Sequence, residues 1–110
     1  MFAVCASGDQ PGLDFYNSLD GSGKAKLMAL FKRLGDTGRI DHREKFKKLD
    51  GELWEFKSHQ IRMPCAFRHP RLVVVTHGFI KKTGRIPPAE IARAERILNE
   101  DTVCDEKRRR

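Results

Sequence analysis

Cysteine pairs with the spacing of a metal site or a disulfide framework are absent from this chain. Its three cysteines, Cys5, Cys65 and Cys104, are odd in number and far apart, whereas such sites need short, paired spacings. No grouping of histidine, cysteine and carboxylate residues resembles a catalytic metal-ligand set either. The sequence therefore predicts no metal and no other cofactor, and the unpaired cysteines favour a reducing cytoplasm.

Long apolar runs are also missing. No run approaches the roughly 20 residues of a membrane-spanning helix, so we expect no membrane partner, and the N-terminus lacks the pattern of a secretory signal. A chain of 110 residues is too short for two independent cores, so we expect one domain over residues 1–101. Residues 102–110 end in four consecutive basic side chains and predict a disordered basic tail, because chain termini tend to fray.

Positive charge is in excess, and the excess lies in the middle of the chain. Residues 41–86 carry 11 Lys and Arg against 5 Asp and Glu, whereas the two flanking sections are close to balance. A basic surplus confined to one section favours a surface that attracts a polyanion. A solvated lysine-rich surface that only aids solubility explains the charge count almost as well.

The N-terminal half has the patterns of short helices. Leucines at helical spacing predict a helix over Lys24–Leu34 that ends at Gly35. We further expect a short strand over Phe2–Ala6, a short helix over Leu13–Leu19 and a polar loop over Asp36–Leu49.

From Glu52 onward the periodicity changes to two, which is typical of strands. Trp54 and Phe56 share one face of the first strand and are the expected core anchors. Further strands are expected over Ile61–Phe67 and Leu72–Gly78, with a turn over His69–Arg71 between them. Consecutive strands of this kind form an antiparallel meander.

Two proline positions qualify this pattern. Pro64 has no backbone N–H and predicts a bulge or a free edge in the middle strand. Pro87 and Pro88 fit the first positions of a helix whose apolar stripe would be Ile91, Ala94, Ile97 and Leu98. Helices, then a sheet, then a helix predict an α+β fold.

The loop between the last strand and this helix is the most informative segment. The apolar run Val73–Val75 leads within a few residues to Lys81 and Lys82. Lysines held between a packed strand and a proline-initiated helix occupy fixed positions, unlike those of a solvated tail. They predict a contact with phosphate, and therefore with nucleic acid.

In order and spacing, two motifs resemble the RelE/HigB superfamily of bacterial toxins, and more narrowly its phage-derived Gp49-like branch. They are Leu53-Trp54-Glu55-Phe56-Lys57 and His77-Gly78-Phe79-Ile80-Lys81-Lys82-Thr83. The resemblance covers roughly residues 13–100. It implies a RelE-like domain with a basic sheet face, an endoribonuclease that cleaves mRNA at the ribosome, and a cognate antitoxin, commonly a helix-turn-helix protein.

Cleavage of RNA without a metal needs cations at the scissile phosphate, where negative charge develops. Arg62 can hold two phosphate oxygens, whereas Lys57, Lys81 and Lys82 act as point charges. The resemblance implies functional roles for these four positions. The expected RNA-binding set is Lys57, Arg62, Arg68, Lys81, Lys82 and Arg85.

Proton transfer to and from the RNA oxygens is the second requirement. Glu55 and His77 are the candidates, so the expected catalytic residues are Glu55, Arg62, His77, Lys81 and Lys82. A structural ion pair explains Glu55 equally well, and a core histidine explains His77. The sequence leaves open two other classes, a non-catalytic RNA- or DNA-binding module and a phage interaction protein.

Overall fold

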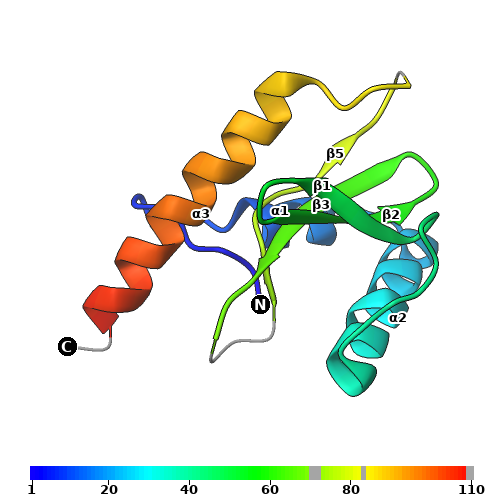
Figure 1. The fold of residues 1–110 in the computed structure, drawn as a ribbon, viewed down its shortest axis with the longest axis horizontal. Helices are drawn as coiled ribbons and strands as arrows, with labels where there is room; N and C mark the ends of the chain where they lie inside the picture. Colours follow the sequence, from blue (N-terminus) through cyan, green and yellow to red (C-terminus); the bar gives the residue numbers. More distant parts are fainter. Residues whose placement is uncertain (70–72, 83, 109–110) are drawn as a thin grey trace.

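The computed structural model describes residues 1–69, 73–82 and 84–108. Two N-terminal helices precede an antiparallel sheet, and a long helix follows it (Figure 1). This confirms the α+β fold expected from the sequence. The elements are α1 (Pro11–Ser18), α2 (Gly21–Thr37), β1 (Phe46–Asp50), β2 (Leu53–Ser58), β3 (Ile61–Phe67), β4 (Val73–Val75), β5 (Phe79–Ile80) and α3 (Pro88–Arg108).

Helix α2 begins where Asp20 caps it, through Asp20 Oδ1, which accepts a hydrogen bond from the Gly23 N–H at 2.6 Å. The predicted end at Gly35 is wrong. The helix ends at Gly38, which has a φ of 79° and donates its N–H to the Leu34 carbonyl at 2.8 Å. The left-handed conformation that terminates a helix is needed at Gly38, while Gly35 remains inside the last turns.

The sheet has the order β1-β2-β3-β4, and β5 pairs with β3 as well (Figure 1). The end of the predicted loop over Asp36–Leu49 is therefore wrong, because β1 begins at Phe46 and pairs antiparallel with β2. A tight turn at Asp50-Gly51 joins these two strands, and Gly51 has a φ of 53°. The expected three-stranded meander thus gains a strand at its edge.

The last predicted strand, Leu72–Gly78, is shorter than expected. Only Val73–Val75 forms β4, and pairing with β3 resumes at Phe79 as β5. The expected turn over His69–Arg71 and Leu72 fall largely on residues 70–72, outside the described residues. Gly78 passes so close to the ring of Phe15 that a Cβ there would overlap it.

The interruption between β4 and β5 lies opposite Pro64. β4 pairs with residues 65–67 of β3, and β5 pairs with residues 61–62. The Pro64 carbonyl accepts a hydrogen bond from the Thr76 N–H at 2.9 Å. Since the N–H and C=O of one strand residue point to the same edge, the donor that Pro64 lacks falls on this gap. The prediction of a locally free edge is confirmed in this form.

Helices α2 and α3 lie on opposite faces of the sheet (Figure 1). Phe56, Met63 and Cys65 pack with the leucines of α2, and Phe56 is fully buried, as expected. Trp54 is only partly buried and stacks on Phe46 with 5.2 Å between ring centroids. On the other face, a second core contains Leu53, Ala66, Val74 and the predicted α3 residues Ala94, Ile97 and Leu98, with Ile91 packed against them.

The expected strand over Phe2–Ala6 is reduced to one bridge between Phe2 and Val75. Side chains of α3 bind the backbone that follows. Asp101 Oδ1 accepts from the Val4 N–H at 2.9 Å, and Glu100 Oε1 accepts from the Ala6 N–H at 2.8 Å. The segment therefore turns from the sheet toward the helix.

Helix α3 continues to Arg108, so residues 102–108, expected as part of a disordered tail, are helical. Residues 109–110 lie outside the described residues, and the domain boundary at residue 101 stays a prediction. Among the described residues, no helix is both long and apolar enough to cross a membrane.

Two neighbouring residues of α2 test the packing of this core. Leu27 is fully buried, whereas 48% of Met28 is exposed. We expect Leu27→Ala to lower the free energy of unfolding by about 2 to 5 kcal/mol, because it leaves a cavity. Met28→Ala should change it by about 0.5 kcal/mol or less. Urea denaturation measures both, and equal losses would contradict the assigned orientation of α2.

Candidate functional site

Four strands bring positive charges around one carboxylate, on the sheet face that α3 covers at its other end. Lys47 of β1 lies opposite Glu55 of β2, and Lys57 of β2 lies opposite Arg62 of β3. Lys81 follows β5, and its backbone N–H donates to the Gln60 carbonyl at 2.7 Å. We call Lys47, Glu55, Lys57, Arg62 and Lys81 the Glu55 cluster. All four cations act electrostatically on the Glu55 carboxyl group.

Glu55 lies at the centre of this cluster and is fully buried. Its Oε1 lies 3.9 Å from Lys47 Nζ and 4.0 Å from Arg62 Nε. Within the described residues, neither carboxylate oxygen accepts a hydrogen bond. Burial raises the pKa of Glu55, although the surrounding cations act in the opposite direction. The carboxylate is therefore held by charge attraction and not by hydrogen bonds.

Arg62 is the fixed cation of the cluster. Its side chain is buried, and Nη1 donates to the carbonyls of His59 at 2.6 Å and Ile61 at 2.9 Å. Both carbonyls belong to the β2–β3 turn region, where His59 has a φ of 56°. One side of the guanidinium is thus bound to the backbone, which limits the two-oxygen grip on phosphate that the sequence suggested.

Lys57 is a crowded cation. Burial lowers its pKa, and the charges of Lys47 and Arg62 lower it further, whereas Glu55 acts in the opposite direction. An ammonium group with a lowered pKa is a stronger acid than an ordinary lysine. Lys57 is thus the member of the cluster best suited to transfer a proton.

His77 lies apart from the cluster, within the protein interior. It is fully buried, its Nδ1 lies 3.0 Å from Thr76 Oγ1, and its ring stacks on Phe79. Burial, and then the charges of Arg93 and Arg96, lower the pKa of His77 to about 4. The imidazole is neutral at pH 7, so its 3.4 Å approach to Glu90 Oε1 is not an ion pair there.

The remaining predicted residues are not gathered at the cluster. Lys82 and Arg85 are exposed in the segment after β5. Arg68 follows the far end of β3 and binds Glu52 Oε1 at 2.8 Å. It lies six residues beyond Arg62, which is roughly 20 Å along an extended strand.

Lys47 is the cluster residue that the sequence analysis missed, because its segment was read as a loop. The signal that could have found it is Asp50-Gly51, a favoured pair in two-residue hairpin turns. A strand on both sides of that turn would have placed Lys47 beside Glu55. No three metal-ligating side chains of the described residues come together in a way that could hold a metal ion.

The buried state of His77 predicts a pH dependence of stability. The unfolded imidazole has an ordinary pKa near 6.5, and the folded one has a pKa of about 4. Stability from the neutral ring is therefore complete above about pH 6.5 and is lost as the pH falls toward 4, by about 3 kcal/mol in all. Urea denaturation at pH 7, 5.5 and 4.5 measures the slope.

The control for this measurement is the exposed His42. We expect His77→Gln to reduce the loss of stability between pH 6.5 and 4, and His42→Gln to retain it. The same slope in His77→Gln and the wild type would show that other groups cause the acid sensitivity.

Comparison with known proteins adds a family to this geometry. The family model described as "Phage derived protein Gp49-like (DUF891)" matches residues 14–99, nearly the range over which the sequence showed its resemblance. No curated protein matches the chain. Because the match spans most of the chain, the protein belongs to the Gp49-like family, a phage-derived family related to the RelE/HigB toxins.

Proposed function

We propose that this protein is the toxin of a type II toxin–antitoxin system and a metal-independent endoribonuclease that cleaves mRNA on the ribosome. The observation that carries the proposal is the Glu55 cluster, where four cations from different parts of the sheet converge. Such a group of fixed positive charges suits the phosphate of an RNA strand. Family membership supports the same class of protein.

In the proposed reaction, the scissile phosphate binds over the cluster. The ribose 2′-oxygen attacks phosphorus and gives up its proton to water, the bond to the 5′-oxygen breaks, and a 2′,3′-cyclic phosphate forms. Arg62, Lys81 and Lys47 neutralise the charge that develops on the phosphate oxygens. Lys57 donates a proton to the leaving 5′-oxygen, a role that its lowered pKa favours.

Glu55 and His77 act differently from the other candidates in this proposal. Glu55 is fully buried, so it positions the cations and does not touch the RNA. His77 belongs to the packing between the sheet and α3. The exposed Lys82 and Arg85 provide further phosphate contacts beside the cluster.

The proposed protein partner is a helix-turn-helix antitoxin, which rests on the family relationship alone. A short adjacent reading frame encoding such a protein is expected, and its product should bind the purified chain. Failure of that product to bind or to restore growth would contradict the toxin assignment.

One observation favours a second candidate, an RNA-binding protein without catalysis. Glu55 and His77, the two residues expected to move protons, are both buried in this structure. Incubation with ribosomes and a translated message separates the candidates. Binding without cleavage would favour the second.

Variants of Lys57 test the enzyme directly. We expect Lys57→Ala to lower the rate of mRNA cleavage by about 100-fold to 1,000-fold, as for other groups that stabilise a transition state. Lys57→Arg keeps the positive charge but cannot release a proton at neutral pH. It should therefore bind RNA normally and still lose cleavage, measured with ribosomes and a translated message in EDTA.

The matched control is Lys32→Ala, which removes an exposed lysine of α2 and should cleave like the wild type. Cleavage by Lys57→Arg at the wild-type rate would exclude Lys57 as the proton donor.

Lys81 tests the charge-neutralising part of the site. We expect Lys81→Ala to weaken cleavage by about 100-fold and to relieve growth arrest when the chain is expressed in a bacterial host. Equal growth arrest by Lys81→Ala and the wild type would count against a role for the cluster in toxicity.

A further inference from the structure

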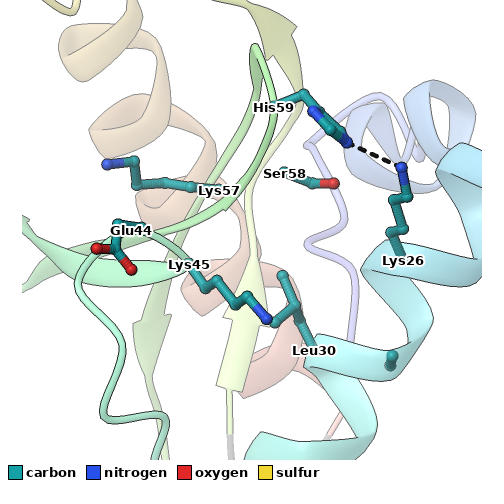
Figure 2. Close-up of a pocket in the computed structure, with 8 residues that line it drawn as sticks. Lys26, Leu30, Glu44, Lys45, Lys57, Ser58 and His59 are labelled. Atoms are coloured by element: carbon teal, nitrogen blue, oxygen red, sulfur yellow. Dashed lines mark hydrogen bonds between the residues drawn. The ribbon is translucent and has the colours of Figure 1, made fainter.

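A hollow of about 430 Å³ lies beside the Glu55 cluster, between α2 and the sheet (Figure 2). Its walls come from α2, the segment before β1, the end of β2 and the turn after it. The lining residues are Lys26, Ala29, Leu30, Glu44, Lys45, Lys57, Ser58 and His59. This volume falls within the range of small-ligand sites.

Positive side chains enter this hollow from two walls. Lys45 extends toward Leu30 from the segment before β1, and Lys26 extends from α2 toward His59 (Figure 2). Lys26 Nζ lies 2.8 Å from His59 Nε2, and an ammonium group can only donate, so the ring nitrogen accepts. Among the lining residues, Glu44 is the one carboxylate against three lysines. The hollow is thus suited to an anion.

The hollow and the cluster share Lys57. This residue lines the hollow and is one of the four cations around Glu55. Its backbone N–H donates to the Lys45 carbonyl at 2.8 Å, so Lys45 lies on the neighbouring chain segment. In Figure 2, Lys57 and Lys45 point in different directions from this pairing. One RNA strand that crosses the end of β2 can therefore contact both sites.

Ala29 and Leu30 give the hollow an apolar wall, and Ser58 adds a hydroxyl group. A bare anion site would not need the apolar surface. A nucleotide presents both kinds of chemistry, since its phosphate is anionic and its base and ribose have apolar faces.

Resting on the function proposed above, we propose that the hollow binds the nucleotide next to the scissile phosphate in the same RNA strand. Lys26 and Lys45 bind the phosphate of this nucleotide, and its base or ribose packs against Ala29 and Leu30. The cluster thus performs the chemistry, and the hollow holds the neighbouring nucleotide in place.

The test measures binding of a mixed-sequence 12-nucleotide RNA that is 2′-O-methylated and so lacks the attacking hydroxyl. Fluorescence anisotropy over a salt series compares the wild type, the Lys26→Ala/Lys45→Ala variant and a control. The control, Lys32→Ala/Lys107→Ala, removes the same charge from exposed positions that do not line the hollow. Cleavage of a translated message on ribosomes is measured with the same proteins.

We expect the hollow variant to lose about tenfold in affinity at low salt, and its salt slope to fall by about 0.7 to 1, as for one lost phosphate contact. The control should bind like the wild type. Equal binding by the hollow variant and the control would overturn the inference, even if the wild type cleaves mRNA. Weaker binding by the hollow variant alone would support it, even if the wild type cleaves nothing, which is the outcome that overturns the proposed enzyme.

Discussion

A carboxylate with no exposed surface lies among four positive charges, and the arrangement of the sheet's open end depends on this contact. Two unit charges 4 Å apart interact by about 4 kcal/mol at the effective dielectric constant of a protein surface. Repulsion among Lys47, Lys57 and Arg62 would therefore separate them if Glu55 did not offset it. Because Glu55 is buried beneath them, the cations stay close together while their positive field faces outward.

The chain topology leaves this part of the sheet available. Helix α3 packs on Leu53, Ala66 and Val74, at one end of the face that carries the cluster. Pairing along β3 stops opposite Pro64 and resumes with β5, which brings Lys81 beside the β2–β3 turn. The gap in the sheet and the site are thus connected, because the chain must leave the sheet after Val75 and return before Lys81.

Local pattern predicted the parts of the fold that depend on one segment. The stripes of α2 and α3 and the strand over Ile61–Phe67 follow from apolar spacing alone. β1 was missed because Phe46–Asp50 is an edge strand with adjacent lysines and no clean alternation. Lys81 and Lys82 look equivalent in sequence, and only the pairing of β5 with β3 puts Lys81 at the cluster. His77 likewise depends on the docking of α3, a contact between distant segments.

The central claim is that RNA binds over the Glu55 cluster, and side-chain NMR tests it most directly. The lysine Cε and arginine Nε signals are followed while a short 2′-O-methylated RNA is added. The account predicts that Lys47, Lys57, Arg62 and Lys81 shift together at low RNA concentration, before the exposed Lys32. Shifts confined to other basic residues, or none at the cluster when the RNA is bound, would contradict it.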